Sequence, residues 1–175
     1  MKSSKNEFSG AANTQKYRLT DKTVQIDGRT LYQIQALRNI PEHHVEEGDL
    51  GGFIEHKRNL SQKGDAWVCD GLYPALVYGD ARVSGDALIG ACAHVYGNAK
   101  VYGNAEVKDS AKVYGNAEVY GNAKVEDRAK IYGNAKVCDY AVVSDEGEVK
   151  DSAIAYGEAR VYYNEVLSDK MKLDM

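Results

Sequence analysis

A six-residue repeat dominates the chain and runs without a change of register from Ala75 to about Asn164. Its most regular stretch, 94–105, reads His-Val-Tyr-Gly-Asn-Ala-Lys-Val-Tyr-Gly-Asn-Ala. Apolar and polar residues alternate over four positions of each unit, which indicates a strand with one buried face. Gly and Asn follow, and both adopt positive φ easily, so each unit predicts a strand and a corner. Because every strand keeps the same inside–outside order, the chain must wind onward as a solenoid.

Variation among the repeats predicts the number of sides. The residues that immediately precede the corners fall into three series, and the members of one series are eighteen residues apart. Two of the three series are mostly tyrosine, and the third is mostly polar. This period predicts an all-β, three-sided solenoid with 18 residues per coil and five coils in the regular part, about 24 Å long. The tyrosines are Tyr78, Tyr96, Tyr114 and Tyr132 in one series, and Tyr102, Tyr120 and Tyr156 in the other.

The Val-Tyr-Gly-Asn-Ala-Lys unit resembles the hexapeptide repeat of left-handed parallel β-helix proteins, over roughly Leu60 to Asn164. Only this resemblance implies left-handedness, because crossovers between parallel strands are generally right-handed. The segment 48–55, Gly-Asp-Leu-Gly-Gly-Phe-Ile-Glu, and the Gly-Asp-Ala-Trp-Val of 64–68 are similar to a narrower group of bacterial and phage proteins. Members of that group are often labelled acyltransferases because of their fold. The wider family commonly forms trimers about the prism axis.

The segments outside the repeat divide the chain. Residues 1–15 are rich in Ser, Asn, Lys and Gly, and we predict a disordered tail. Residues 16–59 predict a β-hairpin cap and a connector, because alternating runs flank an Asp-Gly pair, a strong hairpin signal. The hairpin would cover the open end of the first coil. The β-helix itself is predicted over 60–164, and a C-terminal cap or tail over 165–175.

Two details refine the start of the solenoid. Gly48, Gly51 and Gly52 are interpreted as tight turns leading into it. The spacing from Ala66 to Ala75 is nine residues rather than six, which predicts a small loop at a corner.

Composition narrows the class of protein. The 22 basic and 26 acidic residues of the 175-residue chain nearly balance, which gives no general attraction to nucleic acid or anionic membranes. The sequence has neither a bilayer-spanning apolar run nor a signal-peptide pattern. Its three cysteines are widely separated, which favours a reducing compartment, so we expect a cytoplasmic protein.

The outward tyrosines are the candidate binding residues. Thirteen tyrosines against two phenylalanines is a composition typical of interfaces, since tyrosine combines apolar area with a polar tip. Lys112 and Lys130 lie beside the first tyrosine series in the other outward column, as does His94. Alternatively, stacked tyrosines only stabilise neighbouring strands.

Metal sites are weakly indicated. Asp109, Asp127 and Asp145 recur every eighteen residues at corners, where stacked carboxylates could bind a cation. Polar corners are equally normal in solenoids, and nearby basic residues could neutralise these carboxylates. His43 and His44 precede two glutamates, a pattern that also fits a solvated loop. We expect no metal.

Two functions remain open. The first is a non-catalytic binding or scaffold protein without a cofactor, acting through its tyrosine faces on itself or another protein. Such a protein would be a homo-oligomer, with a trimer favoured over a dimer, and an inhibitor of a host system is a version suggested by the phage resemblance. The alternative implied by the family is a coenzyme-A-dependent acyltransferase that binds acyl-coenzyme A. Its general base would be His94, the only histidine within the repeats.

Overall fold

The computed structural model describes residues 15–90, 92–169 and 172–174, and the described part contains no α-helix. Three longer strands come first: β1 (Tyr17–Ile26), β2 (Arg29–Ala36) and β3 (Leu50–Ile54). Two short 3-10 helices, η1 (Pro41–His43) and η2 (Lys57–Asn59), flank β3. None of the helices in the described residues is long and apolar enough to cross a membrane. The predicted disordered tail lies outside the described residues, apart from its last residue.

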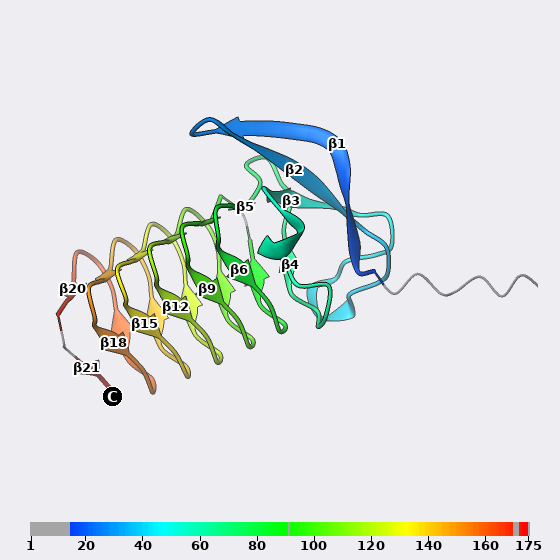
Figure 1. Cartoon of the computed structure of the whole chain (residues 1–175). Helices are drawn as coiled ribbons and strands as arrows, with labels where there is room; N and C mark the ends of the chain where they lie inside the picture. Colours follow the sequence, from blue (N-terminus) through cyan, green and yellow to red (C-terminus); the bar gives the residue numbers. More distant parts are fainter. Residues whose placement is uncertain (1–14, 91, 170–171, 175) are drawn as a thin grey trace, which may run out of the picture.

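The chain then winds as a series of two-residue strands. Each strand pairs in parallel with the corresponding strand of the next coil, and the resulting three sheets form the three sides of the solenoid (Figure 1). Sheet 1 continues from β1, β2 and β3 through β5 (Leu76–Val77), β8 (His94–Val95), β11 (Lys112–Val113), β14 (Lys130–Ile131), β17 (Glu148–Val149) and β20 (Val166–Leu167). Sheet 2 contains β6 (Arg82–Val83), β9 (Lys100–Val101), β12 (Glu118–Val119), β15 (Lys136–Val137), β18 (Ile154–Ala155) and β21 (Lys172–Leu173). Sheet 3 contains β4 (Trp67–Val68), β7 (Leu88–Ile89), β10 (Glu106–Val107), β13 (Lys124–Val125), β16 (Val142–Val143) and β19 (Arg160–Val161).

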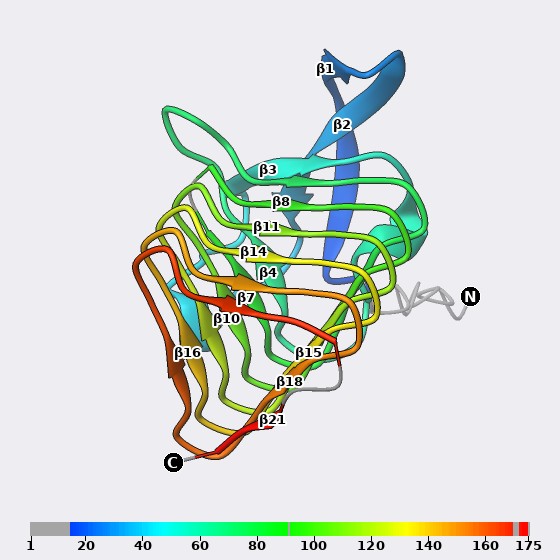
Figure 2. The ribbon, with the colours of Figure 1, turned by 90° about the vertical axis from the view of Figure 1, so that its left-hand side faces the viewer.

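The register confirms the eighteen-residue coil. Lys112 pairs with His94 on one side and with Lys130 on the other, and the remaining rungs of the repeat follow the same spacing. Viewed from the C-terminal end, the coils superimpose as a triangle (Figure 2). The predicted three-sided parallel solenoid is therefore confirmed.

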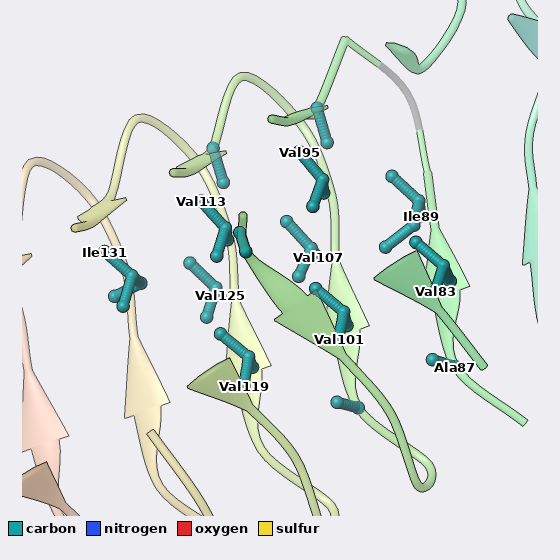
Figure 3. Packing of buried hydrophobic residues seen from close by; sticks show 14 of the residues in the cluster. Val83, Ala87, Ile89, Val95, Val101, Val107, Val113, Val119, Val125 and Ile131 are labelled. Carbon is teal, nitrogen blue, oxygen red and sulfur yellow. The ribbon is translucent and has the colours of Figure 1, made fainter. Parts of the chain in front are cut away.

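Alanine and valine fill the interior. Ala99 and Val101 have no exposed surface, and the same holds for nearly every alanine and valine at these two positions of the repeat. The valines of successive coils form columns inside the tube (Figure 3). A narrow tube has room only for small side chains, and each six-residue unit therefore places one alanine and one valine or isoleucine in the interior.

Corners are made by residues with left-handed backbone. Gly103 has φ +71°, and the Asn side chains that follow such glycines stack between coils, as Asn98 donates to Asn116 at 3.0 Å. At other corners aspartate takes the glycine position, with φ of +58° at Asp109 and +59° at Asp127. Asp and Asn tolerate this conformation better than other residues with a side chain.

The hairpin covers the first coil, as predicted. Asp27 and Gly28 form its turn, with φ of +50° and +74°. At the other end of the hairpin, the Tyr17 hydroxyl donates to the Leu60 carbonyl at 2.8 Å. Figure 1 shows the hairpin lying across the N-terminal end of the solenoid, with its tip extending past β5.

The connector contains a strand that the turn interpretation missed. Gly51 and Gly52 lie in β3, without positive φ, and β3 pairs antiparallel with β2 and parallel with β5. A Cβ on Gly51 would lie 2.6 Å from the Val68 carbonyl oxygen, so these glycines permit close packing rather than turning.

Irregularity is confined to the two ends. A loop over 69–75 projects from the corner between sheets 3 and 1, at the place where the spacing of nine predicted an insertion (Figure 2). Leu72 at its tip is 89% exposed. At the C-terminal end, β20 and β21 extend sheets 1 and 2 within the segment predicted to be a cap or tail.

Candidate binding surface

A ladder of stacked tyrosines runs along the corner between sheets 1 and 2. The rings of Tyr78, Tyr96, Tyr114 and Tyr132 stack in sequence, each pair with centroids 5.0 Å apart and planes within 3° of parallel. Each tyrosine precedes a corner glycine, so the in-register backbone places the rings above one another. The first series of candidate residues therefore forms one continuous surface.

The ladder lies against the outer face of sheet 1. The Tyr132 hydroxyl donates to Glu148 Oε2 at 3.0 Å, and Glu148 projects outward from β17. The hydroxyls of Tyr96 and Tyr114 have no hydrogen-bond partner among the described residues. Burial raises the pKa of both tyrosines, so both hydroxyls keep their protons at neutral pH and are available as donors.

Only the N-terminal end of the ladder is covered. Tyr78 is 6% exposed and packs with Leu31 of β2 and Phe53 of β3. Burial raises its pKa to about 12. Tyr96 is partly buried against the same cluster, and Tyr114 and Tyr132 extend beyond it along the solenoid.

Beside the ladder, the outward column of sheet 1 carries adjacent cations. Lys112 lies in register between His94 and Lys130, and Lys130 pairs with Glu148 at 2.8 Å. Lys112 is exposed and has no carboxylate partner in the part of the chain that the structure describes. Like charges on directly opposed residues are destabilising, so an anion near Lys112 would be stabilising.

Most of the outward charged side chains of sheets 2 and 3 form ion pairs with other side chains of the same sheet. In sheet 2, Glu118 binds Lys100 at 3.0 Å and Lys136 at 3.3 Å. In sheet 3, Lys108 pairs with Glu126 at 3.2 Å, within a network that also holds Glu106 and Lys124. Salt-bridge networks of this kind stabilise neighbouring rungs.

The second tyrosine series is short. Tyr102 and Tyr120 stack with centroids 5.0 Å apart at the corner between sheets 2 and 3, and Cys138 takes the next place. This pair therefore has the same stacking geometry as the first ladder, and it lies next to a face whose charges are largely paired.

Stacked aspartates line the third corner, between sheets 3 and 1. Asp127 Oδ2 accepts from the Asp145 amide at 3.2 Å, and Asp145 Oδ2 accepts from the Tyr163 amide at 3.4 Å. Both carboxylates thus accept a hydrogen bond from the next coil through one oxygen, and both side chains are exposed. The corner is an open, acidic groove of about 520 Å³, lined by Asp109, Ser110, Asp127, Arg128, Asp145, Glu146, Tyr163 and Asn164.

No group of three or more His, Cys, Asp or Glu residues within the described ranges is placed to hold a metal ion. The aspartates instead have a structural role, since they combine a left-handed corner with a hydrogen bond to the next coil. His43 also has a structural contact, with Nε2 3.0 Å from the Asp86 carbonyl oxygen.

His94 lies in a separate, mostly apolar pocket of about 350 Å³ between the hairpin and the corner loop. Burial and the nearby Lys112 ammonium hold its pKa below the ordinary value, and the Asp27 carboxylate opposes them. The imidazole is therefore neutral at pH 7. The pocket is lined by Val24, Gln25, Ile26, Tyr73, Pro74, Leu76, Cys92 and His94.

The sequence interpretation missed this pocket. It identified His94, the corner loop and the hairpin separately, and only the fold of the hairpin over sheet 1 brings them together. The available signal was the alternation of the apolar Val24 and Ile26 with the polar Thr23 and Gln25, which are exposed on the other face of β1. No protein-family model and no curated protein sequence matches this chain.

Proposed function

We propose that the protein is a non-catalytic scaffold that assembles with copies of itself, and that the tyrosine ladder of one copy binds the acidic corner of the next. The repeat supports membership of the left-handed hexapeptide-repeat proteins. Three cysteines without disulfides support a cytoplasmic location. The observation that supports the proposal is that one chain carries two ladders at different corners, one of tyrosine hydroxyls and one of aspartate carboxylates.

Both ladders have the same axial repeat. Successive coils are about 4.8 Å apart in a parallel sheet, so tyrosines and aspartates each recur at that interval. Two copies with parallel axes would therefore match one hydroxyl to one carboxylate in every coil. Tyr96 and Tyr114 supply hydroxyls without partners in the described residues, and Asp109 and Asp127 supply exposed carboxylates.

Charge complementarity supports the same contact. Lys112 and Lys130 lie beside the tyrosines, and the lining of the acidic groove contains three aspartates and one glutamate against Arg128, which pairs with Glu146 at 3.2 Å. Electrostatic complementarity of this kind fixes the partner and the orientation of an interface.

The contact joins two different surfaces of the same chain, so it is head-to-tail. Copies related by such a contact form a closed ring when the rotation from each copy to the next adds up to a full turn. The two surfaces lie at opposite ends of the same strands: Asp109 precedes β11 and Tyr114 follows it. A three-sided cross-section favours three copies about an axis parallel to the solenoid, and hence a trimer.

Sedimentation velocity tests the proposal. The wild-type protein should be a trimer, and both Tyr96→Ser/Tyr114→Ser and Asp127→Asn/Asp145→Asn should be monomers. Asn tolerates the left-handed corner and keeps the acceptor, so the second variant removes charge and preserves the fold. The matched control Tyr102→Ser/Tyr120→Ser should remain a trimer. A monomeric wild type, or unchanged masses of both variants, would refute the assembly.

The same surface could act on a foreign protein. The resemblance of 48–55 and 64–68 to phage proteins suggests an inhibitor of a host system, by analogy of fold alone. In that case an acidic segment of the host protein would replace the acidic corner of the neighbouring copy.

An acyltransferase is the second candidate, because the neutral imidazole of His94 is suited to act as a general base. No carboxylate is hydrogen-bonded to His94 to orient it, in the part of the structure that is described. Calorimetry with acetyl-coenzyme A distinguishes the two functions. Binding that is lost in His94→Ala would favour the enzyme, and no binding would favour the scaffold.

A further inference from the structure

The His94 pocket has the composition of a small-molecule site. Its volume of about 350 Å³ lies within the range of ligand pockets, which are mostly apolar with a few polar groups. Val24 and Ile26 of the hairpin form one wall, and Tyr73 and Pro74 of the corner loop form another. Leu76 and His94, which project outward from adjacent strands of sheet 1, form the floor.

Three segments therefore enclose the site. The hairpin and corner-loop residues lie outside the regular repeat, whereas Leu76, Cys92 and His94 lie within it. The hairpin segment is anchored nearby, since Val24, Ile26 and Leu76 also pack against the buried cluster around Phe53. The floor and the hairpin wall are thus held in place without a ligand, so binding would require little ordering of these elements.

The polar side of the pocket is formed by His94, with the Lys112 ammonium nearby. His94 supplies the one imidazole, and Lys112 lies in register beside it on the next strand toward the C-terminus. Asp27 at the hairpin tip is the opposing anion, and Lys112 outweighs it at the imidazole. A negative group at this edge would meet an exposed ammonium that has no carboxylate partner in the described residues.

We propose that this pocket binds a small aromatic carboxylate, with its ring between the hairpin and the corner loop and its carboxylate at His94 and Lys112. The flat ring fits the space between Tyr73, Pro74 and Leu76, where aromatic and aliphatic side chains offer stacking and apolar contact. The carboxylate accepts a hydrogen bond from the imidazole and pairs with the ammonium. The apolar walls of the site come from the hairpin and the corner loop and take no part in the tyrosine–aspartate contact, whereas Lys112 is shared between the two surfaces.

Calorimetric titration with 2-naphthoate tests this site, and 2-naphthylmethanol is the neutral ligand of the same shape. Naphthoate should bind, and the alcohol should bind about tenfold more weakly, equivalent to one lost ion pair. No binding of naphthoate at millimolar concentration would overturn the proposal. Equal affinity for the two ligands would overturn the role of the cation.

Two variants locate the binding. Lys112→Gln should weaken naphthoate about tenfold and leave the alcohol unchanged. Tyr73→Ala removes a wall residue that is 66% exposed, and should weaken both ligands with no loss of folding. Arg82→Gln, at an outward position of sheet 2, is the matched control and should bind as wild type. Unchanged affinity in both variants would place the ligand elsewhere and refute the assignment.

Discussion

The ring of Tyr96 lies 5.0 Å from the ring of Tyr114, eighteen residues later, with the two planes 3° from parallel. This distance is close to the spacing of about 4.8 Å between parallel strands. It also lies within the range of about 4.5–7 Å in which aromatic pairs attract each other. The backbone register therefore imposes the stacking, and the side chains take the geometry that the coils give them.

A charged side chain in the interior of the tube should destabilise the fold. Ala117 is fully buried, so Ala117→Glu would place an unpaired carboxylate in a narrow apolar core. We expect a loss of about 3–5 kcal/mol in the free energy of unfolding, measured by urea denaturation. Arg160→Glu changes an exposed outward residue and should stay within about 0.5 kcal/mol of wild type. Equal stability of Ala117→Glu and wild type would contradict the inside–outside assignment.

Gly52 should not tolerate a methyl group. Its Cβ would collide with the Ala75 carbonyl oxygen and lie 2.7 Å from that of Cys69, and backbone atoms cannot move aside. Gly52→Ala should lower the free energy of unfolding by about 1–3 kcal/mol. Gly90→Ala is the control, because its Cβ would meet only Lys108 Cβ at 3.4 Å and its φ is not positive. A stable Gly52→Ala variant would argue against β3 as part of the first coil.

An aspartate corner should accept asparagine and resist alanine. Asp139 has φ +59°, and its Oδ2 accepts from the Gly157 amide at 3.2 Å. Asp139→Ala loses this acceptor and places alanine in the left-handed region, at a cost of about 1–2 kcal/mol. Asp139→Asn keeps the acceptor oxygen and tolerates the left-handed backbone, so its melting temperature should be clearly higher than that of Asp139→Ala. Identical melting temperatures of the two variants would show that neither the acceptor oxygen nor the backbone conformation at position 139 contributes to stability.

Stability should depend on pH through Lys16. Its side chain is buried, and its ammonium donates to the Ala66 carbonyl at 2.6 Å. Burial, helped by Arg38, lowers the pKa of Lys16 from 10.5 to about 8. The unfolded chain therefore binds more protons between these values, and the free energy of unfolding rises with pH across this interval.

Lys16→Met removes this titration, so the stability of wild type relative to the variant should increase from pH 8 to pH 10.5. Urea denaturation of both proteins at several pH values measures the difference, and contributions of other groups cancel. A constant difference would mean that Lys16 is not desolvated in the folded protein.

The repeat predicted much of the architecture, because its information is local and recurs in every unit. The alternation in 94–105 gave the buried Ala99 and Val101, and the eighteen-residue spacing gave the stack of Tyr96 on Tyr114. The irregular segments were harder. Gly51 and Gly52 looked like turn residues, because a sequence does not indicate which glycine needs φ freedom and which needs space.

The sequence by itself determined the coil, its three sides and the inside–outside order of each rung, since these follow from residue periods of two, six and eighteen. The tertiary structure alone decided that the hairpin covers Tyr78 and leaves Tyr114 open, and that Val24, Tyr73 and His94 enclose one pocket. The physical reason is that stacking repeats a single local geometry. Contacts between unrelated segments depend instead on how their side chains pack, which no period encodes.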